Sequence, residues 1–191
     1  MTALPINIIL LGDPAAGKAT QSELLLKKFP LYDLDMGKEL RRLERGSSAM
    51  AKSIRTINKG NLGPTEVVRA ILRHHIEHVS MQKGILFDGN PKMVGEAKLV
   101  AKLLKEQGRR NPFVIYLSIP MHETVTRMME RGREDDTLEA LKNRVKYYRT
   151  NIAEVVSFFR TKYDVKKING LGTVDEVHER IMKAIKEFMR S

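Results

Sequence analysis

The sequence predicts an α/β fold, in which a five-stranded parallel sheet carries helices on both faces. Short apolar runs alternate with longer amphipathic stretches along the whole chain, which is typical of this class. The run Ile85–Phe87 is apolar at every position, and Ile6–Leu11 and Phe113–Ile119 are nearly so, as strands covered on both faces are. With 191 residues, 42% of them hydrophobic, the chain has the length of one domain with one core, and we expect residues 1–191 to form a single domain.

The strands and helices can be placed in chain order from these patterns. Five apolar runs are expected to form strands at Ile6–Leu11, Leu31–Leu34, Ile85–Phe87, Phe113–Ile119 and Val165–Ile168. The amphipathic stretches are expected to form helices at Gly17–Lys28, Pro64–Met81, Val94–Gln107, Met121–Arg131, Thr137–Lys162 and Val174–Met189.

The stretch from Met36 to Gly63 interrupts this alternation. It contains helix-like pieces at Lys38–Arg45 and Ala49–Asn58 and no good strand candidate. A helical insertion at the carboxyl edge of a parallel sheet would overhang the crevice in which such folds bind ligands. We therefore expect a helical flap here, and a second, short and charged flap at 132–136.

Composition narrows the class of partner and the compartment. The formal net charge of +11 favours an anionic partner, but the basic residues are spread over the chain and aromatic residues make up only 6%, so nucleic acid is an unlikely primary partner. No apolar run is long enough to cross a bilayer, and the N-terminus lacks the pattern of a secretory signal. The chain has no cysteine, which excludes disulfides and thiol chemistry. We expect a cytoplasmic protein without a membrane partner.

The first predicted strand runs directly into a glycine-containing turn, and a helix follows. The turn consists of Gly12, Asp13, Pro14, Ala15, Ala16, Gly17, Lys18, Ala19 and Thr20. In a phosphate-binding loop of this kind (a P-loop), backbone N–H groups and the positive end of the helix hold phosphate oxygens, and the lysine reaches over the terminal phosphate. The sequence therefore predicts a nucleoside triphosphate site at this turn.

An acidic residue ends the third predicted strand. Asp88 follows Ile85–Phe87 and is succeeded by Gly89, Asn90 and Lys92. An acid at the carboxyl end of a core strand beside a phosphate loop is placed to organise the water ligands of a phosphate-bound Mg²⁺. We expect Asp88 to act in this way, with no direct protein ligand to the metal.

Four arginines form the third group of candidate residues. Arg127 and Arg131 are four residues apart on one helix face, and Arg133 and Arg144 bracket the pair Asp135 and Asp136. Phosphoryl transfer needs charge neutralisation over the transferred group more than it needs an acid or a base. The arginines are thus candidate catalytic residues, although such a group taken alone is also typical of a solvated helix face.

These blocks, in this order, resemble the adenylate kinase and nucleoside monophosphate kinase family over nearly the whole chain. The family's loop G-x-P-G-x-G-K-G-T-Q is similar to residues 12–21, and its T-G-D-x-x-R and G-x-L-V-P-x-E blocks are similar to residues 36–41 and 60–66. Its D-G-F-P-R-x-x-x-Q block resembles residues 88–96, and its R-x-x-x-R, R-x-D-D and following arginine match 127–144.

The resemblance implies a kinase with an acceptor-binding insertion at about 36–66 and a short lid at about 132–136. It implies that Lys18 and Arg131 hold the donor phosphates of ATP, which enters with Mg²⁺, while Arg133 and Arg144 clamp the transferred group. Together with Asp88 these are the expected catalytic residues.

The same resemblance implies the binding residues. Arg127 and the turn 169–173, which contains Gly172, would contact the ATP base. The acceptor nucleoside monophosphate would be held by Met36, Gly37, Arg41, Asn61, Leu62, Gly63, Gly89, Asn90, Lys92 and Glu96. The family's bond before proline in its D-G-F-P block is cis, so a cis Asn90–Pro91 bond is expected. AMP is the favoured acceptor, and the protein is expected to be a monomer.

Several substitutions relative to the family pattern leave alternatives open. Ala15 and Ala19 replace loop glycines, and alanine suits such a loop only where φ is negative. Glu96 replaces the glutamine that reads adenine, and an ionised carboxylate can only accept hydrogen bonds. One alternative is therefore the same chemistry with CMP, UMP or GMP as acceptor. The other is a nucleotide-binding protein that has lost turnover and acts through closure or through RNA bound to its basic surface.

Overall fold

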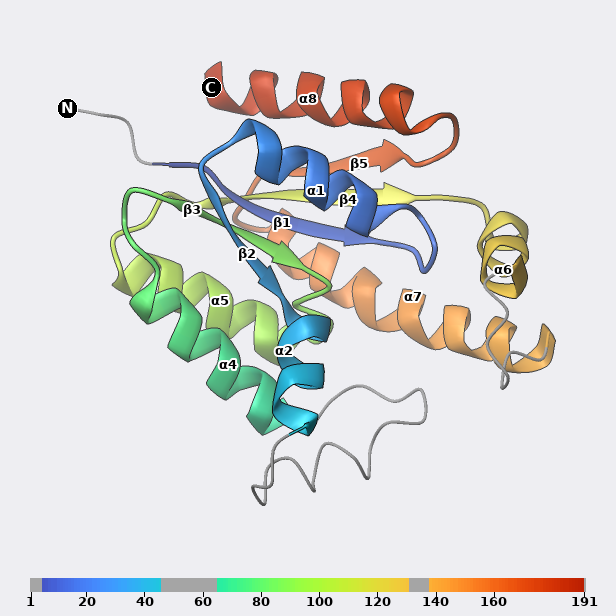
Figure 1. The fold of residues 1–191 in the computed structure, drawn as a ribbon, viewed down its shortest axis with the longest axis horizontal. Helices are drawn as coiled ribbons and strands as arrows, with labels where there is room; N and C mark the ends of the chain where they lie inside the picture. The colour runs from blue at the N-terminus through green and yellow to red at the C-terminus, as the bar shows by residue number, and fades with distance from the viewer. Residues whose placement is uncertain (1–4, 46–64, 131–137, 191) are drawn as a thin grey trace.

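The computed structural model describes residues 5–45, 65–130 and 138–190, and within them it contains the expected five-stranded parallel sheet. The strand order is β2-β3-β1-β4-β5 (Figure 1). The strands are β1 (Asn7–Gly12), β2 (Leu31–Asp35), β3 (Gly84–Asp88), β4 (Pro112–Ser118) and β5 (Val165–Asn169). Each lies within one residue of its expected position, so the fold class predicted from the sequence is confirmed.

Helices cover both faces of the sheet. Their bounds are α1 (Lys18–Lys28), α2 (Met36–Glu44), α4 (Thr65–His78), α5 (Val94–Glu106), α6 (Met121–Glu130), α7 (Leu138–Arg160) and α8 (Val174–Arg190). Helices α1 and α8 lie on one face, and α4, α5 and α7 lie on the other (Figure 1). None of the helices in the described ranges has the length and apolar content that a bilayer crossing demands.

The alternating side chains of β1 show why this strand is apolar from Ile8 to Leu11. Ile8 and Leu10 pack into the cluster under α1 and α8, whereas Ile9 and Leu11 pack into the cluster under α4, α5 and α7. All four side chains are buried. A central strand with two covered faces removes apolar surface from water on both sides, which is the main stabilising contribution to such a sheet.

Two helix ends differ from their expected positions for identifiable reasons. Helix α2 begins at Met36 rather than at Lys38 because the Asp35 side chain caps it, accepting a hydrogen bond from the Lys38 backbone N–H at 3.0 Å. Helix α4 ends at His78 rather than at Met81. The Arg109 guanidinium donates hydrogen bonds to carbonyl oxygens of the segment after it, at Val79, Ser80 and Lys83, and so stabilises a chain that has left the helix.

The sheet order places the candidate site at the carboxyl ends of the central strands. β1 lies in the middle of the sheet between β3 and β4, and the carboxyl ends of these parallel strands meet at the same edge. That edge is where open α/β sheets bind ligands. The expected helix at Ala49–Asn58 and the expected lid at 132–136 lie outside the described residues, and the division into insertion and lid stays a prediction.

Candidate functional site

The turn that follows β1 has the geometry of a phosphate loop. Gly12 ends the strand where a side chain has no room, because a Cβ there would lie 2.8 Å from the Cβ of Leu117. Gly17 is the N-cap of α1 with a φ of 86°, a conformation that glycine adopts without strain. It provides no side-chain cap for the first turn of the helix. Gly17 thus places no side chain between the N–H groups of that turn and a phosphate.

The amine of Lys18 already lies over this loop. Its Nζ donates hydrogen bonds to the carbonyl oxygens of Gly12, at 2.8 Å, and Asp13, at 3.0 Å. The same atom lies 5.8 Å from the centre of the Tyr148 ring. Because Lys18 is anchored at the start of α1, a short rotation of its side chain would exchange these carbonyl oxygens for those of a phosphate.

Ala15 is the strained residue of the loop. Its φ is 59°, in the left-handed region that non-glycine residues rarely occupy. Alanine was expected to suit the loop only with a negative φ, so the structure places this residue where the family's glycine is the better fit. The methyl group packs against the small cluster of Met128, Leu141 and Val145. Ala19, by contrast, is exposed in the first turn of α1.

We expect Ala15→Gly to be more stable than Ala19→Gly by about 1 kcal/mol in the free energy of unfolding, since left-handed alanine costs about 1–2 kcal/mol. Glycine also raises the entropy of the unfolded chain, a cost of about 0.4–1 kcal/mol that both variants carry. Urea unfolding of the two variants and the wild type measures the difference. Equal destabilisation by both substitutions would show that Ala15 is not strained.

Asp88 ends β3 directly beside the loop, in register with Leu10 of β1 and Asp35 of β2. It is partly buried, and burial raises the pKa of its carboxyl above the usual range. The neighbouring carboxylates of Asp35 and Asp33 raise this pKa further, whereas the Lys18 charge lowers it. The described residues contain no group of three acidic or histidine side chains placed to hold a metal ion. Asp88 alone beside the loop fits the expected role of orienting the water ligands that Mg²⁺ keeps.

The acceptor side is organised around Glu96. This side chain is buried, and its Oε2 accepts hydrogen bonds from the Asn90 side-chain amide at 3.0 Å and from the Lys92 backbone N–H at 2.8 Å. The backbone N–H of Met93 donates to the same oxygen at 3.3 Å. The Asn90–Pro91 bond is cis, as expected. Glu96 thus holds the 90–93 loop and caps α5, and that it also reads the acceptor base stays a prediction.

The start of α2 contributes the other described acceptor-side residues. Met36 is buried in the core cluster under α4 and α5, so its side chain packs in the core, and its predicted contact with the acceptor stays a prediction. Arg41 is exposed, and its guanidinium lies so close to Gly37 that a Cβ at that glycine would lie 3.1 Å from Arg41 Nη1. Lys38, at the position of the family's aspartate, pairs with Asp33 at 3.0 Å and Asp35 at 3.5 Å.

Lys92 brings a cation toward these carboxylates. Burial lowers the pKa of its amine, and the carboxylates of Glu96, Asp88 and Asp35 oppose that effect. Gly89, with a φ of 74°, makes the turn that leads to it. A partly buried lysine among acidic groups keeps a positive charge near the place where an acceptor phosphate is expected.

On the donor side, Arg127 of α6 reaches the phosphate loop. Its Nη1 donates a hydrogen bond to the carbonyl oxygen of Ala15 at 3.3 Å, and its Nε pairs with Glu123 at 2.6 Å. Gly172, with a φ of 111°, lies in the turn between β5 and α8, where Arg180 binds the carbonyl oxygens of Asn169 and Leu171. The structure thus brings Arg127 to the loop.

The remaining predicted site residues lie outside what the structure describes. These are Asn61, Leu62, Gly63, Arg131 and Arg133. Arg144 lies on α7, but its side chain is outside the described set. Their roles stay predictions based on the family resemblance.

The sequence reading missed the partner of Asp13. The Asp13 side chain is fully buried and pairs with Arg149 of α7 at 3.0 Å. Arg149 belongs to no motif, and 136 residues separate it from Asp13. No local pattern could have identified this pair.

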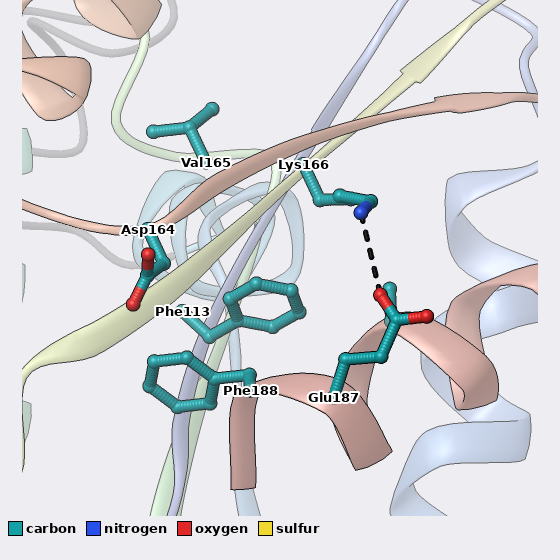
Figure 2. Close-up of a pocket in the computed structure, with 7 residues that line it drawn as sticks. Phe113, Asp164, Val165, Lys166, Glu187 and Phe188 are labelled. Atoms are coloured by element: carbon teal, nitrogen blue, oxygen red, sulfur yellow. Dashed lines mark hydrogen bonds and ion pairs between the residues drawn. The ribbon is translucent and has the colours of Figure 1, made fainter. Parts of the chain in front are cut away.

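Another hollow lies away from this edge of the sheet. Figure 2 shows it between the start of β4, the start of β5 and the end of α8, with Phe113 and Phe188 stacked at 4.6 Å and Lys166 paired with Glu187 at 3.3 Å. Lys166 and Glu187 neutralise each other, Asp164 is the remaining charged group of the lining, and the two rings pack together. It offers none of the chemistry found at the carboxyl edge.

Comparison with known proteins identifies the family. The model of the adenylate kinase family matches residues 10–164, which include the phosphate loop, Asp88 and the arginines. A protein of Azobacteroides pseudotrichonymphae named adenylate kinase is 36% identical over 190 residues, covering 97% of this chain and 100% of its own.

Two further relatives carry the same name. The protein from Parabacteroides distasonis is 32% identical over 185 residues and covers 94% of this chain and 97% of its own. The protein from Leptospira biflexa is 32% identical over 184 residues and covers 94% and 99%. The similarity therefore extends over nearly the whole length of each protein.

Proposed function

Because this chain belongs to the adenylate kinase family, we propose that it transfers the γ-phosphoryl group of ATP to AMP and so forms two molecules of ADP. The relatives are named adenylate kinase, and this name supports phosphoryl transfer with ATP and AMP as the two substrates. The residues at the carboxyl edge of the sheet support the same conclusion independently of the name.

The observation that carries the proposal is the position of Lys18 relative to the loop and to Asp88. The lysine amine lies within 2.8–3.0 Å of the loop carbonyl oxygens. From there it can reach the β- and γ-phosphates of a nucleotide bound in the loop. A carboxylate at the end of the adjacent strand stands beside it. A phosphate loop, a lysine and an acid on neighbouring strands are the elements that phosphoryl transfer needs.

In the proposed reaction a phosphate oxygen of AMP attacks the γ-phosphorus of ATP, and the bond from that phosphorus to the β,γ-bridging oxygen breaks. The bridging oxygen keeps the electron pair, so ADP leaves and no free phosphate forms. The loop N–H groups and Lys18 stabilise charge on the donor oxygens. Asp88 would orient the water ligands of a Mg²⁺ ion bound with ATP, and that ion would supply charge neutralisation on the phosphates.

We propose that Arg41 and Lys92 hold the acceptor phosphate from two sides. Arg41 lies on α2, and Lys92 follows the cis Asn90–Pro91 bond. Both are cationic, and Arg41 can bind a phosphate through two parallel hydrogen bonds. The roles of Arg131, Arg133 and Arg144 in closing over the donor are proposed from the family pattern.

We also propose that the enzyme acts as a monomer in the cytoplasm. The absence of cysteine among its 191 residues is compatible with a reducing compartment. Light scattering on the purified protein tests the first part, since a mass near 21.8 kDa is expected.

Acceptor choice is tested by measuring ADP formation from ATP and Mg²⁺ with each of AMP, CMP, UMP and GMP against a control without acceptor. Turnover with AMP well above the control and above the other three supports the proposal. A clear preference for another monophosphate would keep the chemistry and change the acceptor. No ADP formation with any of the four monophosphates, in a protein that still binds ATP, would favour a nucleotide-binding role.

Replacing Glu96 by glutamine should raise the ratio of kcat/KM for AMP over that for CMP by about tenfold, the value of one hydrogen bond. The amide oxygen can keep the hydrogen bonds from the 90–93 loop, and the new N–H group can donate to adenine N1. Glu106→Gln at the exposed end of the same helix is the matched control. An unchanged ratio would mean that Glu96 holds the loop without reading the base.

A further inference from the structure

The carboxylate of Asp13 is the most completely bound charged group of the phosphate loop. It is fully buried, and each of its oxygens accepts two hydrogen bonds. Oδ1 accepts from the Tyr116 hydroxyl at 2.9 Å and from Arg149 Nε at 3.0 Å. Oδ2 accepts from the Ile119 backbone N–H at 3.0 Å and from Arg149 Nη2 at 3.0 Å.

Arg149 links three elements through this contact. Its side chain comes from α7, it holds the loop carboxylate in a two-pronged pair, and Nη2 also donates to the Ile119 carbonyl oxygen after β4 at 2.6 Å. The preceding residue, Tyr148, lies beside Lys18. Two successive residues of α7 therefore contact the loop, one at its acid and one at its lysine.

The position of Asp13 makes this neutralisation important for the donor site. The carbonyl oxygen of Asp13 is itself an acceptor for the Lys18 amine, so the residue belongs to the turn that surrounds the phosphates. An uncompensated carboxylate in that turn would repel a triphosphate, and the repulsion is strong because the group is removed from water. Burial and the Asp13 charge both raise the pKa of Tyr116, which keeps its proton on the hydrogen bond to Asp13.

We propose that Arg149 is a positioning residue of the donor site: by binding Asp13 it cancels the negative charge of the phosphate loop and fixes the loop for ATP. The inference rests on the proposed function only in taking ATP as the ligand of this loop. It assigns to an arginine outside the family's motifs the task of making an acidic phosphate loop compatible with a polyanion.

The charge relation predicts an asymmetry among variants. Arg149→Met leaves a buried carboxylate without its cation, and we expect KM for ATP to rise by at least about tenfold while KM for AMP changes by less than about twofold. Asp13→Asn introduces no repulsion, and we expect KM for ATP to stay within about threefold of wild type. In the double variant, KM for ATP should be lower than in Arg149→Met and equal to that of Asp13→Asn. Arg149→Lys, which keeps the charge but loses the paired geometry, should fall between wild type and Arg149→Met.

The control is Arg160→Met at the exposed end of the same helix, which should leave both KM values unchanged. A merely structural pair would instead move both KM values together, and the double variant would be no better than Arg149→Met. Either of these results, or an unchanged KM for ATP in Arg149→Met, would overturn the proposal. If Arg149→Met does not fold, the KM values for ATP of Asp13→Asn, Arg149→Lys and the double variant are compared with that of the wild type and test the proposal in the same way.

Calorimetric titration with ATP alone separates this inference from the proposed function. If the wild type binds ATP but transfers no phosphoryl group to any monophosphate, the proposed function fails. The effect of the variants on the Kd for ATP then still tests Arg149: a rise of at least about tenfold in Arg149→Met that the second substitution reverses supports it, and equal Kd values contradict it.

Discussion

Replacing Lys18 by methionine should reduce phosphoryl transfer by at least about a thousandfold, because one preorganised charged donor at a reacting phosphate is worth this much or more. Methionine preserves most of the length of the side chain and removes the ammonium group. In the structure that group donates to the carbonyl oxygens of Gly12 and Asp13 and is therefore held above the loop before any ligand arrives. Its loss removes the group closest to the expected γ-phosphate.

The fold should survive the Lys18→Met change, because Lys18 is only partly buried and its hydrogen bonds go to loop carbonyls rather than to the core. We expect the free energy of unfolding to change by less than about 1 kcal/mol. Lys27→Met, in the last turn of the same helix, is the matched control and should keep the wild-type rate. A Lys18→Met enzyme with more than a tenth of the wild-type rate would remove the lysine from the mechanism.

Replacing Asp88 by asparagine should lower kcat by about a hundredfold and raise the Mg²⁺ concentration needed for half-maximal rate, since an oriented charge at the metal is lost. The same change should not destabilise the protein at neutral pH. Burial raises the pKa of Asp88, so keeping it ionised there costs free energy, and asparagine carries no such cost. Asp164→Asn, at an exposed carboxylate just before β5, is the control.

The raised pKa of Asp88 also fixes the direction of the pH dependence. The contribution of this group to folding stability is fully present below its unfolded pKa and is lost as pH rises through its raised folded pKa. Activity follows the opposite direction because the ionised form is needed at the metal. The rate should thus fall as pH drops through the raised pKa, and this acidic limb should be missing in Asp88→Asn. A limb that persists in the variant would assign it to another group.

Strands β1, β3 and β4 were predictable because each is a mostly apolar run that follows or precedes turn residues. β1 is the clearest case, since the side chains from Ile8 to Leu11 enter two different cores in alternation. Helix α2 was placed two residues too late because the capping bond from Asp35 to Lys38 depends on where β2 ends. The end of α4 depends on Arg109, which lies far along the chain, and long-range contacts of this kind leave no periodic signal.

The candidate site was predictable where one segment carries its own geometry. The turn from Gly12 to Thr20 is a local feature that its residue types are enough to indicate. The cis bond at Asn90–Pro91 was expected from the resemblance of this segment to the family's D-G-F-P block. The Asp13–Arg149 pair joins residues brought together only by the packing of α7 against the sheet. The direction of the Glu96 side chain likewise depends on the path of the 90–93 loop, which the motif does not specify.

The central claim is that the γ-phosphoryl group of ATP passes directly to AMP. It is tested most directly by incubating the protein with ATP labelled at the γ-phosphate, Mg²⁺ and unlabelled AMP, and by separating the products. We expect the label in the β-position of ADP, only when AMP is present, with negligible label in free phosphate. Label that appears as free phosphate whether or not AMP is present, or no loss of label from ATP at all, would contradict the claim.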